Sequence, residues 1–317
     1  MSRVDPRAAE WFVRRSSTAA DWRLDDVLTT KACTGTRISV VIPARNEQDT
    51  VAEVVTRIRT ELVEGAGLVD ELIVMDSLST DDTAARAADA GATVHHVGAV
   101  RPDLGSRAGK GEALWKSQFV ASGDVLVFID ADLTEWGAYF VTALVGPTLA
   151  DPQVQLVKGF YDRVFKTGDE PAPQGGRVTE LVARPLLALR RPELSAVVQP
   201  LAGEWAVRRA HFAQLAVPVG YGVEMASLLD TATLCGIDAV AQVDLGRRAH
   251  RHQSVHDLGV MATEILAVAD RRSFGTEPAA HTLNQFVRSG DSGWRTRDVP
   301  VDERPPAAGV PAERRAG

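Results

Sequence analysis

The sequence predicts an α/β fold built on a doubly wound, mostly parallel sheet. Strand-like and helix-like segments alternate four times between residues 37 and 130, and the strand-like segments are nearly unbroken apolar runs. Such alternation favours parallel strands joined by right-handed crossovers. Strands that are covered on both faces also lack the polar and apolar alternation of half-exposed ones. Ligands of these sheets bind at the carboxyl ends of the strands.

The first predicted strand is RISVVIPARNE, residues 37–47, and Pro43 ends it. Asn46 is a candidate cap for the next helix, with Glu47 in the first turn. From Val51 to Leu62 the apolar residues recur at the i, i+3, i+4, i+7 spacing of one buried face. This unit is therefore a strand followed by an amphipathic helix.

The same unit then repeats towards residue 130. Capping hydroxyls and early acids mark the helix starts, and short apolar runs mark the strands. The predicted elements are the strand DELIVMDS (70–77), the helix STDDTAARAADAGA (79–92), the strand TVHHV (93–97), the helix GKGEALWKSQFVAS (109–122) and the strand DVLVFID (124–130).

The regular alternation of strand-like and helix-like segments ends after residue 150. We predict a strand over 154–165, a loop rich in turn formers over 166–176, helices over 177–191 and 221–236, and a strand over 237–246. The predicted division is an N-terminal arm (1–36) with a helix near AAEWFVRR, a first half (37–150), a second half (151–274) and a partly flexible tail rich in Pro and Ala (275–317).

Composition narrows the classes of function. The chain has 317 residues, 45% of them hydrophobic and 24% charged, and a net charge of −7. This acidic balance argues against a nucleic-acid or anionic-membrane partner. We find no signal-peptide pattern and no apolar run of membrane-spanning length. Cys33 and Cys235 form neither a disulfide framework nor a zinc pattern. We therefore expect a cytoplasmic protein with no membrane partner.

Polar clusters follow three of the predicted strands: Pro43–Glu47, Asp76–Ser77 and Asp130–Asp132. Because strand ends of a parallel sheet meet at one edge, these clusters should share a cleft. Carboxylates of a D-x-D motif suit Mg²⁺ or Mn²⁺, which bind phosphate oxygens. The alternative is two solvated acids at a strand end.

Other polar groups leave two interpretations open. RAGKGEALW fails the P-loop pattern, but Lys110 at a helix start favours an anionic ligand, or else marks a simple turn. His250 and His252 suit a metal or phosphate, or a basic surface segment. Arg177 at a helix start would favour a carboxylate or phosphate. Tyr221 and Glu224 fit a site or a structural role equally.

Two reaction classes compete for the D-x-D motif. VFIDADLT matches the nucleophile motif of haloacid-dehalogenase-type phosphatases, in which the first Asp attacks phosphate. Here the motif falls on the fourth strand, and the Asp81-Asp82 pair precedes it instead of following it. This order favours the second class, transfer of a sugar from a nucleotide donor.

The segments VVIPARNE, DELIVMDSLSTDDT, GKGEALW and FIDAD resemble GT-A glycosyltransferases. Four further segments, GGRVTELVARPLL, VVQPLAGEW, GYGVEM and AQVDLGRRAHRH, resemble the glucosyl-3-phosphoglycerate synthase family, over about residues 20 to 270. The resemblance implies a retaining, homodimeric enzyme that moves glucose from UDP-glucose to the 2-hydroxyl of 3-phosphoglycerate. Mannosyl-3-phosphoglycerate synthases, which use GDP-mannose, share the motifs and are the alternative; a regulator would bind the donor without transfer.

The resemblance also implies that residues 37–150 form a nucleotide-sugar-binding half and residues 151–274 an acceptor-binding half, and it implies roles for individual residues. Catalysis would involve Lys110, Asp130 and Glu224. The metal, Mg²⁺ or Mn²⁺, would be held by Asp132 and His250. The acceptor would be bound by Gly176, Arg177, Val178, Thr179 and His252. The donor would be bound by Pro43, Ala44, Arg45, Asn46, Glu47, Ser77, Lys110, Asp130, Ala131, Tyr221, Gly222, Val223 and Glu224.

Two positions depart from the family pattern. Ala131 replaces the serine of D-S-D, and His252 replaces the asparagine of H-R-N. A backbone contact would survive the first change and a hydroxyl contact would not. The change to histidine at position 252 bears on the affinity for the acceptor and on the pH dependence of that affinity. For the retaining reaction we favour same-face attack, because Glu224 is the nearest candidate for a glycosyl nucleophile and no residue is an obvious one.

Overall fold

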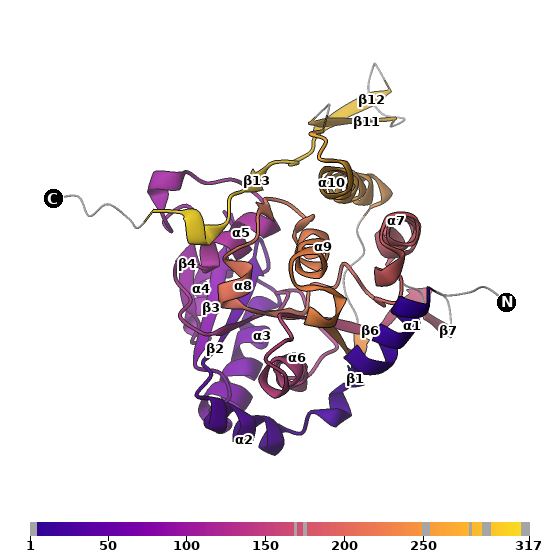
Figure 1. The fold of residues 1–317 in the computed structure, drawn as a ribbon. Helices are drawn as coiled ribbons and strands as arrows, with labels where there is room; N and C mark the ends of the chain where they lie inside the picture. Colours follow the sequence, from indigo (N-terminus) through magenta and orange to yellow (C-terminus); the bar gives the residue numbers. More distant parts are fainter. Residues whose placement is uncertain are drawn as a thin grey trace.

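One twisted sheet runs through the molecule, with helices on both faces (Figure 1). The structure is a computed structural model that describes residues 5–167, 170–173, 176–248, 254–278, 281–286 and 293–311. Across the sheet the strands follow the order β1 (Ser16–Thr18), β10 (Val240–Arg248), β6 (Leu156–Thr167), β8 (Trp205–Arg208), β5 (Val125–Phe128), β2 (Ile38–Ala44), β3 (Glu71–Asp76) and β4 (Thr93–His96).

The predicted doubly wound, mostly parallel sheet is confirmed. The ladders β5–β2–β3–β4 and β1–β10–β6 are parallel. Strand β8 lies antiparallel between β5 and β6 and joins these two parallel blocks. The predicted nucleotide-sugar-binding and acceptor-binding halves therefore share one continuous sheet.

Two apolar cores cover the two faces of the sheet. One core lies under α2 (Leu24–Thr34), α3 (Val51–Ile58), α4 (Thr83–Asp89) and α6 (Tyr139–Ala150). The other lies under α1 (Pro6–Arg15), α5 (Lys110–Ser117), α7 (Arg184–Arg190), α8 (Arg209–Phe212), α9 (Val223–Cys235) and α10 (Val255–Phe274). The carboxyl ends of the parallel strands stay open between these layers.

Helix α3 begins later than the cap prediction placed it. Its N-cap is Thr50, so the expectation that Asn46 caps this helix is wrong. Asn46 has a φ of 56°, in the left-handed region that asparagine tolerates. Its side-chain oxygen accepts a hydrogen bond from the Thr80 N–H at 2.9 Å, which ties the end of β2 to the loop after β3.

The N-terminal arm packs against the rest of the fold and adds a strand to the sheet. Helix α1 confirms the predicted helix near AAEWFVRR, and its Trp11 is fully buried, with Nε1 donating to the carbonyl of Val240 at 2.9 Å. Strand β1 then extends the sheet beyond β10. The predicted loop over 166–176 is also partly wrong, because β7 (Glu170–Pro173) pairs antiparallel with the end of β6.

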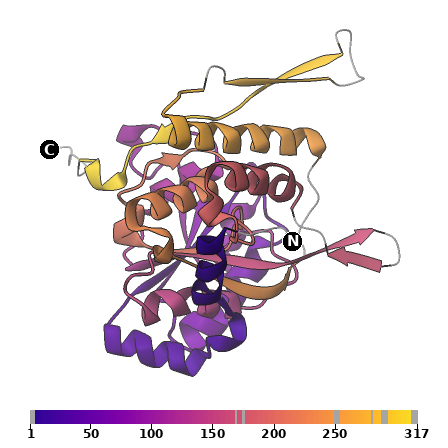
Figure 2. The same cartoon turned by 45° about the vertical axis from the view of Figure 1, so that its right-hand side comes forward.

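The tail differs most from its prediction. Strands β11 (Thr282–Phe286) and β12 (Trp294–Asp298) form a hairpin that projects beyond α10 (Figure 2). The chain then returns to the body, where β13 (Glu303–Arg304) pairs with β9 (Val217–Pro218). Val299 and Val301 are buried beside Val260 of α10, so the expected flexibility does not hold for this part of the tail.

Over the described ranges, no helix has both the length and the apolar character that a membrane crossing requires.

Candidate active site

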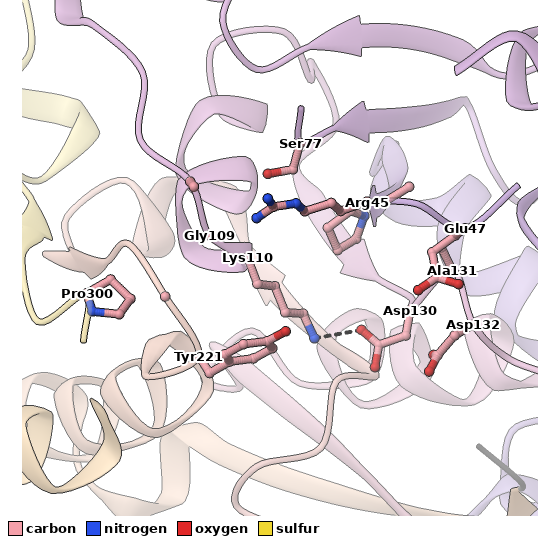
Figure 3. Close-up of a pocket in the computed structure, with 14 residues that line it drawn as sticks. Arg45, Glu47, Ser77, Gly109, Lys110, Asp130, Ala131, Asp132, Tyr221 and Pro300 are labelled. Carbon is pink, nitrogen blue, oxygen red and sulfur yellow. Dashed lines mark hydrogen bonds and ion pairs between the residues drawn. The ribbon is translucent and has the colours of Figure 1, made fainter. Parts of the chain in front are cut away.

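A cavity of about 400 Å³ opens at the carboxyl ends of β2, β3 and β5 (Figure 3). The strand-end clusters meet there, as the sheet topology predicted. The loop before α5 and the turn before α9 close the opposite side. The cavity is lined by Pro43, Ala44, Arg45, Glu47, Ser77, Ala108, Gly109, Lys110, Asp130, Ala131, Asp132, Gly220, Tyr221 and Pro300.

Not every residue expected at the donor site lines this cavity. Asn46 turns towards Thr80, whereas Ser77 lines the cavity. The neighbouring Asp76 is turned to His96, with its Oδ2 2.9 Å from Nδ1 of the ring. Gly222, Val223 and Glu224 are buried at the start of α9, and Glu224 reaches the cavity only through Lys110. The residues His250 and His252 lie outside the described part of the chain.

Lys110 joins two of the expected catalytic carboxylates. Its Nζ lies 2.6 Å from Asp130 Oδ1 and 2.8 Å from Glu224 Oε1. Burial lowers the pKa of Lys110, but the two carboxylates outweigh burial and raise this pKa well above its ordinary value. Lys110 is therefore a permanent cation in the wall of the cavity.

Arg248 is a site residue that the sequence interpretation missed. At the end of β10, its Nη2 lies 3.3 Å from Asp130 Oδ2 and 3.2 Å from Asp132 Oδ1. Its Nη1 lies 2.9 Å from the buried carboxylate of Glu204. One guanidinium thus fixes the separation of the two aspartates. The available signal was an arginine at the end of a buried strand, in the segment DLGRRAHRH.

The two aspartates differ in how their charges are compensated. Burial raises the pKa of Asp130, but Lys110 and Arg248 hold it well below its ordinary value. For Asp132, burial and then the neighbouring Asp130 raise the pKa, and Arg248 and Lys110 oppose this rise only in part. An added cation would therefore stabilise the Asp132 carboxylate more than that of Asp130.

The donor set at Asp132 fits a hard divalent cation. Carboxylate oxygens are the ligands that Mg²⁺ and Mn²⁺ prefer, together with water and phosphate oxygens. Among the described residues, no group of three or more His, Cys, Asp or Glu side chains could hold a metal ion by itself. A cation here would need ligands beyond this set, from a bound nucleotide or from the segment 249–253.

The glycines of GKG serve backbone packing. The N–H groups of Gly111 and Glu112 donate to the carbonyls of Gly220 (3.1 Å) and Val219 (2.9 Å). A Cβ at Gly111 would stand 1.8 Å from the carbonyl oxygen of Pro218, which excludes any larger residue. These two N–H groups are therefore engaged within the protein. The Lys110 side chain remains to face a ligand.

The expected acceptor residues lie apart from the lining of this cavity. Gly176, Val178 and Thr179 are buried and Arg177 is exposed, at the start of the short helix η4 (Thr179–Ala183). The Glu180 N–H donates to the Gly176 carbonyl at 2.9 Å, which fixes the turn into the helix. These four consecutive residues, here called the η4 cluster, lead directly into the helix.

Glu264 of α10 holds the turn that carries Tyr221. Its carboxylate accepts the Tyr221 N–H, and burial raises its pKa to about 7. Because this folded-state pKa exceeds the unfolded value, the folded protein binds more protons than the unfolded chain, and the free energy of unfolding falls as pH rises from about 4.5 to 7.

Glu264→Gln should remove this pH-dependent loss of stability, which is worth about 3 kcal/mol. Urea unfolding of both proteins between pH 4 and 8 checks it; equal slopes would contradict it.

Comparisons with known proteins give one consistent result. Residues 39–191 match the family model described as glycosyl transferase family 2. A protein of Mycolicibacterium smegmatis is 45% identical over 298 residues, 93% of this chain and 96% of the relative; one of Petrotoga mobilis is 44% identical over 74% of this chain and 73% of the relative. Both are named glucosyl-3-phosphoglycerate synthase.

Solved structures agree with these relatives. The crystal structure of glucosyl-3-phosphoglycerate synthase from Mycobacterium tuberculosis, in complex with Mn²⁺, UDP-glucose and phosphoglyceric acid, matches with a TM-score of 0.81 and 45% identity. The match covers 90% of this chain and 94% of that one. Another crystal structure of that protein, with Mn²⁺, UDP-glucose and glycerol 3-phosphate, matches with a TM-score of 0.80 and 44% identity.

Proposed function

Because this chain belongs to the glucosyl-3-phosphoglycerate synthase family of glycosyltransferases, we propose that it moves glucose from UDP-glucose to the 2-hydroxyl of 3-phosphoglycerate and releases UDP. The observation that carries this proposal is the convergence of Lys110, Asp130 and Asp132 in one cavity at the strand ends. Both relatives are named glucosyl-3-phosphoglycerate synthase, and the solved complex contains UDP-glucose. These similarities disfavour the GDP-mannose alternative.

The geometry also speaks against a phosphatase nucleophile at Asp130. Both of its carboxylate oxygens are engaged, one by Lys110 and the other by Arg248. An attacking carboxylate needs a free oxygen, and cationic partners on both oxygens lower its nucleophilicity. The GT-A fold of the matched crystal structures supports the sugar-transfer class instead.

The donor is assigned to the lined cavity. Pro43, Ala44, Arg45, Glu47 and Ser77, which line it, would hold the uridine part. Tyr221 would face the sugar, and Glu224 would act on that side through Lys110. A divalent cation, bound by Asp132 and His250, would supply Lewis-acid stabilisation of the leaving diphosphate. Lys110, a permanent cation in the wall, would add to that stabilisation through its charge. Asp130 and Ala131 would contact the sugar nucleotide between them.

The acceptor is assigned to the η4 cluster. Arg177 and Thr179, with Gly176 and Val178, would hold the carboxylate or phosphate of 3-phosphoglycerate, and His252 would complete that set. Arginine and backbone N–H groups at a helix start favour such anions. Positioning of the acceptor hydroxyl beside the donor contributes several kcal/mol to a two-substrate reaction, of order 7 or more in the best cases.

Retention of configuration is proposed to occur by same-face attack. A double displacement needs a free carboxylate, whereas the Glu224 carboxylate is 4% exposed and is paired with Lys110 at 2.8 Å. Mass spectrometry of the Glu224 peptide after mixing with UDP-glucose should show no attached glucose. A glucosylated Glu224 would overturn this assignment.

The homodimer and the cytoplasmic location stay predictions from the sequence. Light scattering of the purified chain should give a mass twice that of the 34.0 kDa protomer. A single protomer mass across the concentration range would contradict the dimer.

A donor panel tests the function directly. The chain is incubated with 3-phosphoglycerate, Mg²⁺ or Mn²⁺, and UDP-glucose, GDP-mannose or ADP-glucose in turn, and nucleotide release is measured. We expect the highest kcat/KM with UDP-glucose. Faster turnover of GDP-mannose would restore the mannosyl alternative, donor binding without turnover would restore the regulator, and release of phosphate from simple esters would restore the phosphatase.

A further inference from the structure

The tail segment 299–305, here called the C-terminal strap, lies against the donor cavity. Pro300 lines the cavity, and Figure 3 shows it on the side opposite Asp132. The strap is fixed by β13, which pairs with β9, and by the Asp302 carbonyl, which accepts the Val219 N–H at 3.0 Å. A segment more than 150 residues after the D-x-D motif therefore completes a wall of the site.

Arg304 is the anchor of the strap. It is buried, and its Nε and Nη2 each lie 2.7 Å from one oxygen of the fully buried Glu112 carboxylate on α5. Its guanidinium stands 5.0 Å from the ring centre of Trp115, whose Nε1 donates to the Pro305 carbonyl at 2.8 Å. A buried bidentate ion pair of this kind is both strong and geometrically specific.

The same arginine also holds the loop that leads into Lys110. Its Nη1 donates to the Leu104 carbonyl at 2.9 Å, and its Nη2 to the Gly105 carbonyl at 3.3 Å. Glu112 in turn accepts the Arg107 N–H at 3.3 Å. The Arg107 guanidinium lies 3.1 Å from the Asp302 carboxylate of the strap.

This loop supplies the donor wall. Ala108, Gly109 and Lys110 follow Arg107 directly, and all three line the cavity. Lys110 is the first residue of α5, directly after the loop, and its Nζ must stay within hydrogen-bond distance of Asp130 Oδ1, from which it lies 2.6 Å away. A displacement of the loop would therefore disturb this contact. The loop is tied to α5 and to the strap through the Arg304 guanidinium and the Glu112 carboxylate. The Arg107–Asp302 pair and Lys116 Nζ, which donates to the Gly105 carbonyl at 2.9 Å, add further ties.

We propose that Arg304 is a positioning residue of the donor site, which acts through Glu112 and the 104–109 loop to place Lys110. This inference rests on the proposed function, since it names the donor as the substrate affected. If the Arg304–Glu112 pair served stability alone, its loss would alter the melting temperature and leave the two substrate affinities in their original ratio. The proposed role alters donor affinity selectively.

The test uses full-length Arg304→Met, Glu112→Gln and the double variant. Loss of the paired hydrogen bonds should lower kcat about 10-fold by displacing Lys110, and should raise the KM for UDP-glucose about 10-fold by displacing the wall at Ala108 and Gly109. The KM for 3-phosphoglycerate should stay within about twofold. The two substitutions remove one interaction, so the double variant should be no worse than the worse single one. Arg297→Met, which breaks the surface pair with Asp257, is the matched control and should leave both KM values unchanged.

Arg304→Lys keeps the buried charge and loses the paired geometry, so it serves where the methionine variant fails to fold. It should raise the donor KM by a smaller factor and leave the acceptor KM unchanged. Calorimetric UDP binding with Mn²⁺ reports on donor affinity without turnover. Unchanged UDP affinity in folded Arg304 variants, or an equal rise of both KM values, would overturn the inference. Absence of transfer by the unmodified chain would overturn the proposed function instead.

Discussion

Asp132→Asn is expected to lower kcat/KM about 1,000-fold and to abolish the metal dependence of UDP binding. The substitution keeps the size of the side chain and an oxygen that can accept from Arg248, which lies 3.2 Å from Asp132 Oδ1. It removes the carboxylate whose charge is the less compensated of the two. Without that charge, a divalent cation would lose its proposed ligand in the segment after β5, and the leaving diphosphate would lose the stabilisation assigned to that cation.

The measurement is calorimetric titration of UDP with and without Mn²⁺, together with kcat and KM. Asp89→Asn, an exposed residue at the end of α4, is the matched control and should behave as the unmodified chain. If Asp132→Asn showed the same gain in UDP affinity on adding Mn²⁺ as the control, Asp132 would not be a metal ligand.

Lys110→Met is expected to lower kcat about 100-fold. Methionine keeps most of the volume but removes the cation that lies 2.6 Å from Asp130 and 2.8 Å from Glu224. The leaving diphosphate then loses a positive charge in the wall. The buried Glu224 carboxylate and the half-buried Asp130 carboxylate also lose their shared partner, so the pKa of Asp130 should rise towards its ordinary value.

Lys31→Met is the matched control, because Lys31 also pairs a carboxylate, Asp70 at 2.9 Å, but at the opposite edge of the sheet. It should leave kcat unchanged. Steady-state kinetics over a range of UDP-glucose concentrations separates kcat from KM. A Lys110→Met enzyme with full kcat and only a raised KM would show that the lysine binds the donor equally in ground and transition states.

The parallel half of the fold could be predicted because each of its elements carries its own local signal. Strands β2, β3 and β5 are apolar runs that end at polar residues, and α3 has a single apolar face. Because ligands of parallel sheets bind at the carboxyl ends of the strands, the sequence also predicted that Ser77, Asp130 and Asp132 share one cavity, as they do. The cap at Asn46 failed because its side chain bonds to Thr80 instead of to a helix N–H.

The rest depends on contacts between distant parts of the chain. Strand β8 has four residues and no periodicity, and it is a strand because β5 and β6 pair with it on both sides. Arg248 resembles any other arginine in a basic run until the sheet places it against Asp130 and Asp132. The strap looks like a flexible tail in composition, and only the burial of Arg304 against Glu112 reveals its place.

The central claim is transfer of glucose from UDP-glucose to the 2-hydroxyl of 3-phosphoglycerate with retention. The most direct measurement is NMR of the product formed from UDP-glucose, 3-phosphoglycerate and Mn²⁺. The account predicts an α-glucoside joined at carbon 2 of the glycerate, formed in equal amount with UDP. Free glucose, a β-glucoside or a glucose joined at any other position of the acceptor would contradict it.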